Sequence, residues 1–146
     1  MARQDFNFFF GFRVRYSEID AQGVVFNAHY LTYFDTAITE YFRHIGFDNQ
    51  ANLAQTGDDF HLVKSEVIYE APILFDAEIE VGCRASKLGR TSLTFTLEIF
   101  EKGSARRYAT GEIVWVNTHQ PTHQTKPLNN ALRRLLTEFE NLPAHA

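Results

Sequence analysis

The spacing of apolar residues changes from a period of two to a period of three to four within the first third of the chain. Residues 6–16 read FNFFFGFRVRY and alternate, which predicts a strand. The positions of the apolar parity are Phe6, Phe8, Phe10, Phe12, Val14 and Tyr16. Residues 17–27 contain Gly23 and polar side chains, so we expect a loop there.

From Ala28 to Ile45 the apolar residues recur at steps of three and four, which predicts a helix. Asn27 suits the N-cap and Gly46 the C′ position. The apolar positions are Tyr30, Leu31, Tyr33, Phe34, Ala37, Ile38, Tyr41, Phe42 and Ile45. This stripe is wider than that of a surface helix, so most of the helix should be enclosed.

Four alternating segments follow a polar connection over residues 48–60, in which we expect at most one helical turn. They are residues 61–71, 77–86, 91–100 and 107–116, separated by Pro72 and by the breaks KLGRT and EKGSA. Breaks this short favour antiparallel neighbours. The inward positions are Val63, Ser65, Val67, Tyr69, Ile79, Val81, Cys83, Ala85, Leu93, Phe95, Leu97, Ile99, Ala109, Gly111, Ile113 and Trp115.

An amphipathic helix should close the chain within residues 127–142, through Leu128, Leu132, Leu135, Leu136 and Phe139. The order is then strand, long helix, four strands, helix. One enclosed helix with a run of antiparallel strands is typical of an α+β fold. At 146 residues and 45% hydrophobic content, the chain fits one domain over residues 1–146.

Charge and composition exclude several classes of function. A formal charge of −4 argues against nucleic acid, which usually selects a basic surface. The single cysteine excludes an intrachain disulfide, and Cys83 lies at an inward strand position, which favours a buried hydrophobe over a nucleophile. Neither a signal peptide nor an apolar run of about eighteen residues is present, so we expect a cytoplasmic protein.

Common sequence motifs for nucleophilic catalysis, nucleotide binding and metal binding are absent. The chain contains no GxSxG, P-loop, GxGxxG or HExxH motif. His119 and His123 are four residues apart, but Pro121 stands between them, so they are better read as solvated loop histidines than as metal ligands. We therefore expect no metal and no separate cofactor.

The stretch YSEIDAQGVVFNAHY, residues 16–30, has the residue types of an acyl-transfer site. Asp20 precedes Gly23, which permits a tight turn and a close approach by a ligand. The N–H groups at the following helix start favour negative charge. A carboxylate could serve as base or nucleophile while these groups hold the oxyanion. The alternative is that Glu18 and Asp20 are ordinary loop acids beside a helix start.

The segment RVRYSEIDAQGVVFNAHYLTYFDTA, residues 13–37, resembles the signature of the 4-hydroxybenzoyl-CoA thioesterase family of hotdog-fold acyl-CoA thioesterases. The shared features are an aromatic ending the first strand, acid-x-Asp, a glycine three residues on, two aliphatics, an aromatic and a tyrosine opening the helix. KLGRTSLTF, residues 87–95, is similar to a second segment of the family. Glu18 and Asn27 depart from the pattern, where relatives commonly carry Asp and often His or Tyr.

This resemblance implies a hotdog fold, in which a long antiparallel sheet curls around the central helix and subunits pair edge to edge. It also implies that Asp20 is the catalytic carboxylate and that the N–H near Asn27 polarises the thioester carbonyl. Further residues predicted to contribute to catalysis are Tyr16 and His29, the latter also explained by a polar contact at the helix start. Residues predicted to bind substrate are Gly23, Val24, Phe26, Tyr30, Lys87 and Arg90.

Several residues have a structural explanation beside the functional one. Tyr16 and Tyr30 suit core or pocket wall. Asp35, on the apolar helix, should have a buried partner. Arg90, with Lys87 and Arg84, forms a basic turn that could hold CoA phosphates or be solvated.

We therefore expect an acyl-CoA thioesterase that hydrolyses an acyl- or aroyl-CoA thioester to the free acid and CoA. CoA would be part of the substrate, and the protein would be a homodimer or a dimer of dimers, that is, a homotetramer. Two alternatives remain. One is an acyl-carrier-protein thioesterase, for which Arg84, Lys87, Arg90, Arg106 and Arg107 would form the basic rim. The other is a non-catalytic acyl-thioester binder on the same fold.

Overall fold

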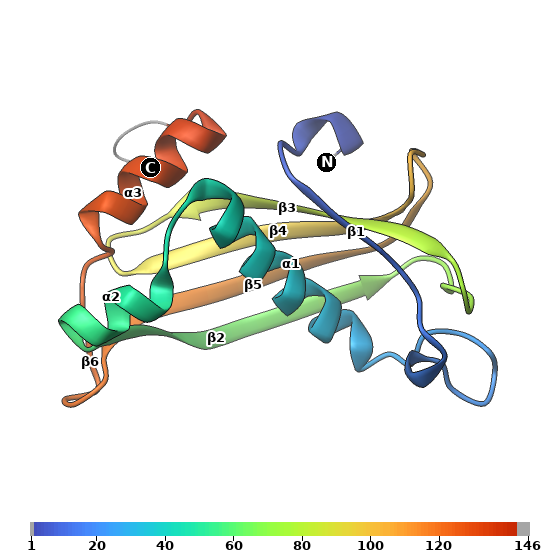
Figure 1. The fold of residues 1–146 in the computed structure, drawn as a ribbon, viewed down its shortest axis with the longest axis horizontal. Helices are drawn as coiled ribbons and strands as arrows, with labels where there is room; N and C mark the ends of the chain where they lie inside the picture. The colour runs from blue at the N-terminus through green and yellow to red at the C-terminus, as the bar shows by residue number, and fades with distance from the viewer. Residues whose placement is uncertain (1, 143–146) are drawn as a thin grey trace.

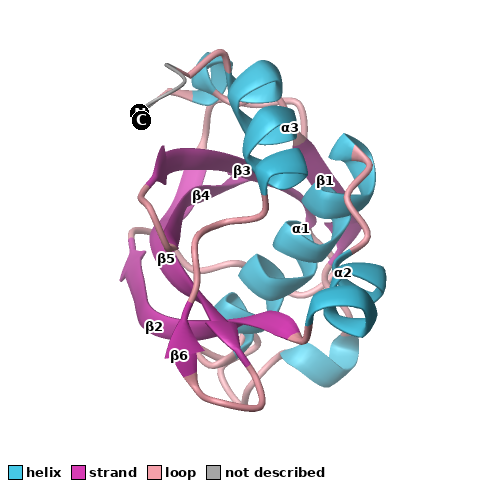
Figure 2. Cartoon of the chain, turned by 90° about the vertical axis from the view of Figure 1, so that its left-hand side faces the viewer, coloured by secondary structure: helices cyan, strands magenta, loops and turns pink. Residues whose placement is uncertain are grey.

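A six-stranded antiparallel sheet curls around helix α1 (His29–Ile45) in the computed structural model, which describes residues 2–142 (Figure 1). The strand order is β1-β3-β4-β5-β2, and β6 pairs with β5. The strands are β1 (Phe9–Arg13), β2 (Asp58–Tyr69), β3 (Glu78–Leu88), β4 (Ser92–Glu101), β5 (Arg107–His119) and β6 (Gln124–Thr125). Figure 2 shows the helices on one side of the curved sheet, with α1 lying in its hollow. The expected hotdog architecture is confirmed.

The core lies between α1 and the inner face of β3, β4 and β5. The alternation predicted for these strands is confirmed, because the inward residues from Ile79 to Ala85, from Leu93 to Ile99 and at Ala109 are fully buried. Gly111 on β5 allows the closest approach of the helix. A Cβ at this position would come within 2.1 Å of the Phe34 ring, so only glycine lets α1 settle this deeply.

Three capping residues mark where the helices begin or end. α1 ends at Gly46, whose φ of 85° permits the left-handed C-cap that the sequence predicts. α2 (Asn49–Thr56) is capped by the Asp48 side chain, which accepts from the Ala51 N–H, and it is longer than the single turn expected there. α3 (Asn130–Glu140) is capped by Asn129 and buries Leu132 and Leu136, as predicted.

The first strand is shorter than predicted. Only Phe9–Arg13 pairs with β3, and two short 3-10 turns flank it, Arg3–Asp5 and Tyr16–Glu18. The inward parity still holds from Phe6 to Val14, both of which are buried. Tyr16 departs from the prediction, because it belongs to the second turn and is 76% exposed.

Strand β2 is confirmed in position, and its predicted inward face is wrong only at Val63. β2 forms one edge of the sheet, and its pairing with β5 shifts register between Leu62 and Lys64, so Val63 stands in a bulge. Val63 is 59% exposed, whereas Val67 packs on the core and the Tyr69 ring contacts Tyr30 of α1. The alternation gave the correct element but could not reveal that β2 lies at an edge.

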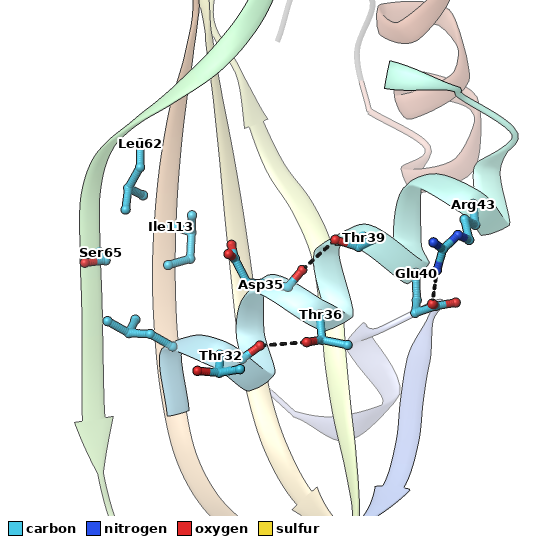
Figure 3. A pocket seen from close by; sticks show the side chains of 10 residues that line it. Thr32, Asp35, Thr36, Thr39, Glu40, Arg43, Leu62, Ser65 and Ile113 are labelled. Carbon is cyan, nitrogen blue, oxygen red and sulfur yellow. Dashed lines mark hydrogen bonds and ion pairs between the residues drawn. The ribbon is translucent and has the colours of Figure 1, made fainter. Parts of the chain in front are cut away.

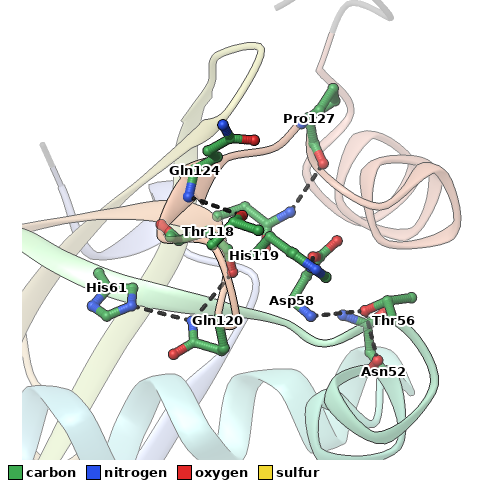
Figure 4. Close-up of polar contacts among 11 residues, drawn as sticks. Asn52, Thr56, Asp58, His61, Thr118, His119, Gln120, Gln124 and Pro127 are labelled. Atoms are coloured by element: carbon green, nitrogen blue, oxygen red, sulfur yellow. Dashed lines mark hydrogen bonds and ion pairs between the residues drawn. The ribbon is translucent and has the colours of Figure 1, made fainter.

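A polar junction joins β2, β5, α2 and α3 at the end of the sheet away from the start of α1 (Figure 4). His119 Nδ1 lies 2.8 Å from Asp58 Oδ1, and the Asn117 amide donates to the Pro127 carbonyl at 3.0 Å. His119 is therefore the last residue of a strand with a carboxylate partner, which corrects its assignment to a solvated loop. His123 is exposed in the following turn. Within residues 2–142, no group of three His, Cys, Asp or Glu side chains could hold a metal ion.

Two further properties of the described residues bear on the sequence analysis. No helix among them is long and apolar enough to cross a membrane. Cys83 is fully buried on β3, as predicted, and burial raises the pKa of its thiol well above the ordinary value.

Candidate active site

The loop that carries Asp20 folds back on itself as a tight hairpin. Ile19 and Val25 form an isolated antiparallel bridge, and the Asp20 N–H donates to the Val24 carbonyl at 2.9 Å. Gly23 donates to the Asp20 carbonyl at 3.0 Å with a φ of 76°. A Cβ on Gly23 would meet nothing within 4 Å, so its backbone conformation, not lack of space, is what favours glycine here.

The Asp20 carboxylate is half-buried, and one of its oxygens is held by its own turn. Oδ1 accepts from the Gln22 N–H at 2.8 Å, as in an Asx turn. Oδ2 has no hydrogen-bond partner among the residues described. The turn thus fixes the side chain while leaving one oxygen open to accept a proton or to attack a carbon.

Glu18 has a different environment from Asp20, although the two acids are separated by one residue. Its side chain is buried and accepts from the Tyr33 hydroxyl at 2.9 Å, from the Arg15 N–H at 2.8 Å and from the Arg15 guanidinium. Burial alone would raise the pKa of Glu18, but these hydrogen bonds and the Arg15 charge lower it. Glu18 is therefore an ionised anchor whose lone pairs are already occupied.

The start of α1 presents two free backbone donors. The N–H groups of Asn27 and Ala28 have no acceptor within residues 2–142, whereas the Phe26 N–H is taken by the Glu18 carbonyl and the His29 N–H by the Phe26 carbonyl. The predicted N-cap is wrong, since Ala28 takes that position and the Asn27 side chain makes no cap. The positive end of the helix dipole adds to these donors.

The other predicted site residues lie around this helix start at different depths. His29 is the first residue of α1 and packs edge-to-face on Phe26, which is 46% exposed. Tyr30 is buried against Tyr69, with ring centroids 4.7 Å apart, so a single chain offers no open Tyr30 surface to a ligand. Val24 is half-buried and bridges to Leu74. The exposed Tyr16 ring contacts Phe75.

A groove of about 510 Å³ runs between α1 and the edge strand β2 (Figure 3). Its helical wall is polar, and Asp35 reaches into it without a hydrogen-bond partner among the described residues. The expectation of a buried partner for Asp35 is therefore wrong. The Thr36 and Thr39 hydroxyls donate to the carbonyls of Thr32 and Asp35, which leaves oxygen lone pairs toward the groove. Asp20 does not line this groove.

The predicted basic turn is not brought to the Asp20 loop within one chain. Asp20 lies beside the segment that leads into β3 at Glu78, whereas Lys87 and Arg90 lie where β3 ends. The eleven residues of β3 separate the two regions by roughly 33 Å. Figure 1 shows the 14–28 loop and the β3–β4 turn at opposite ends of the sheet.

Comparison with known sequences places this chain in a family. The sequence model of the Thioesterase superfamily matches residues 22–107, from the Asp20 loop to the first residue of β5. The chain belongs to the Thioesterase superfamily. The superfamily match contains the free N–H groups of Asn27 and Ala28, all of α1, and strands β2 to β4.

Three proteins that are similar to this chain in sequence or in fold illustrate the likeness. Acyl-CoA thioester hydrolase YbgC of Escherichia coli O6:H1 is 38% identical to this chain over 87 residues. The matched residues are 60% of this chain and 64% of YbgC, so the match spans somewhat under two thirds of the length of YbgC. The PA5185 protein of Pseudomonas aeruginosa PAO1 is 28% identical with a TM-score of 0.83, covering 94% of both chains. Slr0204, a 1,4-dihydroxy-2-naphthoyl-CoA thioesterase from Synechocystis, has a TM-score of 0.84 at 18% identity over 90% of this chain and 96% of that one, which shows the fold alone.

The sequence analysis of this Thioesterase superfamily chain missed the polar wall of the groove. Thr32, Asp35, Thr36 and Thr39 recur at steps of three and four, so they share one helical face opposite the apolar stripe. That spacing was the available signal. It predicts a polar helix face, and only the structure shows that this face borders a groove instead of open solvent.

Proposed function

We propose that this protein is an acyl-CoA thioesterase that hydrolyses an acyl- or aroyl-CoA thioester to the free acid and CoA. The observation that carries the proposal is that one loop and the helix start that follows it supply both an open carboxylate oxygen, on Asp20, and unpartnered N–H groups, on Asn27 and Ala28. The resemblance of residues 13–37 to the thioesterase signature and the likeness to YbgC support the same reaction.

Asp20 would act on the thioester carbonyl carbon in one of two ways. As a general base it would take a proton from water, and as a nucleophile it would form an anhydride that water then cleaves. The leaving CoA thiolate has a pKa of about 8.5, near that of cysteine, so it departs without a strong general acid. The oxygen held by the Gln22 N–H supports either role, because the turn keeps the carboxylate in one orientation.

The free N–H groups of Asn27 and Ala28 would receive the carbonyl oxygen. As the carbonyl carbon becomes tetrahedral its oxygen gains negative charge, and donors that are already oriented stabilise that charge without reorganisation. One such donor is worth roughly 3 to 4 kcal/mol in acyl-transfer enzymes. The role requires only backbone, which explains how Asn27 could stand where relatives carry other side chains.

The groove between α1 and β2 would hold the acyl group. Its unpaired groups are acceptors, namely the Asp35 carboxylate, the threonine oxygens and Ser65, while Leu31, Leu62 and Ile113 supply apolar surface. An acyl or aroyl group that carries a hydrogen-bond donor fits this lining better than a purely aliphatic chain, because an aliphatic chain would cover the exposed Asp35 carboxylate without giving it a hydrogen-bond partner, which is costly.

The active form would be a homodimer or a dimer of dimers. Large apolar side chains are exposed along β2 and around the Asp20 loop: Tyr16, Phe26, Leu31, Leu62, Val63, Ile68, Tyr69, Leu74 and Phe75. The outer edge of β2 also leaves backbone donors and acceptors unpaired. A second copy covering this face would enclose the region between Asp20 and the groove, which one chain leaves open.

The test is a panel of acyl-CoA thioesters assayed on the purified protein with a thiol-trapping reagent. The panel contains short and long aliphatic, benzoyl and hydroxybenzoyl thioesters. Turnover that favours the hydroxylated aroyl members would support both the reaction and the groove assignment. Tight CoA binding without hydrolysis of any member would refute the reaction and favour a non-catalytic binder.

A further inference from the structure

A second cavity, of about 500 Å³, opens at the C-terminal end of α1, away from the Asp20 loop. It is formed by the last turns of the helix, the Gly46–Asp48 connection, the first residues of α2 and Trp115 of β5. It shares Thr39 and Arg43 with the α1–β2 groove, so the two hollows adjoin. None of the predicted site residues lines it.

The wall of this cavity is aromatic and ordered. Phe42 stacks on Trp115 with ring centroids 5.8 Å apart and an interplanar angle of 13°. Phe47, in the connection that follows α1, packs on Phe42 with ring centroids 6.0 Å apart. Trp115 is half-buried. Phe42 is buried, and Trp115 also contacts Phe60 and Phe95, so the ring surface left open belongs to the half-buried Phe47 and Trp115. A partly open aromatic surface favours a planar ligand ring, which stacks on it or meets it edge to face.

Polar groups at the same cavity have unused hydrogen-bonding capacity. The Trp115 indole N–H has no acceptor within residues 2–142. Asn49 donates from Nδ2 to Asp59 at 2.9 Å, which fixes its amide, and its buried Oδ1 then lacks a donor in the described part of the chain. Arg43 stands at the rim as an exposed cation paired with Glu40. The residues of the cavity therefore include an indole N–H without an acceptor and a rim cation beside the aromatic wall, while the Asn49 oxygen is enclosed behind it.

We propose that this cavity is a subsite for a planar aromatic or heteroaromatic ring carried by the thioester substrate. The inference rests on the proposed function, because the ring is taken to belong to a thioester. Two parts of such a molecule have this chemistry: the adenine of CoA, with ring nitrogens, an amino group and nearby phosphates, and an aryl group at the far end of the acyl chain. If adenine is the occupant, the pantetheine arm and not the acyl group would lie in the adjoining α1–β2 groove, and the basic turn at Arg90 would not be the main contact of the nucleotide.

The sole tryptophan of the chain makes the subsite directly observable. Emission of Trp115 and its quenching by acrylamide are measured during titration with CoA, with pantetheine, with S-(4-phenylbutanoyl)pantetheine and with S-butanoylpantetheine. We expect a ring-bearing compound to shield Trp115 and to bind about tenfold more tightly than its ringless counterpart, the effect of one stacked ring. Shielding by CoA alone identifies adenine, and shielding by the phenyl compound alone identifies the acyl end.

Phe47→Leu keeps an apolar side chain but removes the ring, and it should weaken binding of the shielding compound about tenfold. Phe139→Leu, a change to another half-buried aromatic outside the cavity, should leave binding unchanged. No shielding by either ring, or shielding that Phe47→Leu does not weaken, would overturn the subsite. If the protein hydrolyses acyl-CoA but Trp115 fluorescence does not change, the subsite would be refuted and the proposed function would stand. If a ring-bearing compound shields Trp115 but no thioester is hydrolysed, the proposed function would be refuted and the cavity would stand as a ring-binding site.

Discussion

Tyr33 on helix α1 donates its hydroxyl hydrogen to Glu18 Oε1 at 2.9 Å, and both side chains are buried. The bond ties the loop that carries Asp20 to the enclosed face of the helix. Arg15, three residues earlier in the same turn, holds the same carboxylate, so the turn and the helix meet at one anion. Asp20 follows two residues later, and its position relative to the free N–H groups of α1 depends on this anchor.

Tyr33→Phe should loosen the anchor while retaining the ring. The change removes one hydrogen bond to a charged acceptor, so we expect the free energy of unfolding to fall by about 2 kcal/mol and turnover to fall with it. Urea denaturation and acyl-CoA hydrolysis are the measurements. Tyr108→Phe is the control, because Tyr108 is also largely buried but its hydroxyl makes no hydrogen bond among the described residues. Equal losses in the two variants would argue against a special role for the Tyr33 bond.

Glu18→Gln should destabilise the protein in a pH-dependent way. The hydrogen bonds to Glu18 lower its pKa below the ordinary 4.5, so its stabilising effect is present above that pH and is lost as the pH falls through the folded-state value. We expect a deficit of about 2 kcal/mol at pH 7 that shrinks steadily below pH 4.5. Denaturation curves of both proteins from pH 7 to pH 3 measure it. A deficit that is constant over this range would contradict the assignment.

Asp20→Asn should abolish most of the activity without unfolding the loop. An asparagine oxygen can still accept from the Gln22 N–H, so the turn survives, but the amide can neither take a proton nor attack. We expect kcat to fall at least about a hundredfold while KM changes little. Asp76→Asn, at another loop aspartate near the same end of the sheet, is the matched control. Unaltered turnover in Asp20→Asn would exclude Asp20 from the mechanism.

Much of the fold could be predicted from the sequence because periodicity reports burial. The strands around Val81, Phe95 and Ala109 alternate cleanly since one face of each packs on α1. Gly46 ended the predicted helix correctly, because a left-handed C-cap strongly favours glycine. The resemblance of residues 13–37 to the thioesterase signature supplied the fold name, and the match to the Thioesterase superfamily confirms it.

What the sequence could not give depends on tertiary neighbours. Tyr16 has the parity of a core residue, but the chain leaves the strand at Arg13 and turns it outward. Asn27 is a good N-cap by residue type, but its side chain makes no capping hydrogen bond, and Ala28 stands at the N-cap position instead. The assignment of Asp20 to catalysis remains a prediction, because it concerns chemistry that no contact within one chain tests.

Glu140→Gln should stabilise the protein at alkaline pH more than at acid pH. Glu140 is buried at the end of α3, where Tyr41 Oη and the Ala85 N–H donate to Oε2 at 2.5 and 3.0 Å. Burial raises the pKa of Glu140, so its contribution to stability is present at low pH and is lost as the pH rises through the folded-state value. A neutral glutamine avoids that loss. Thermal melts at pH 5 and pH 8 should show a larger gain at pH 8, while the exposed Glu138→Gln shows none. A loss of stability at both pH values would mean that the ionised carboxylate is required.

Ile68→Lys should dissociate the proposed homodimer and reduce turnover together. Ile68 is 53% exposed on the edge strand β2, among the apolar residues that a second copy would cover. A lysine there would place an unpaired charge in the interface, which costs several kcal/mol, and lysine at a sheet edge opposes edge-to-edge pairing. The variant should therefore sediment as a monomer at micromolar concentration and hydrolyse acyl-CoA poorly, with an unchanged melting profile of the monomer fold.

Gln124→Lys on β6 adds the same charge at an exposed position away from this edge and should leave both properties intact. A wild-type protein that is already monomeric and fully active would show that β2 needs no partner. An Ile68→Lys dimer with normal turnover would place the interface elsewhere on the chain.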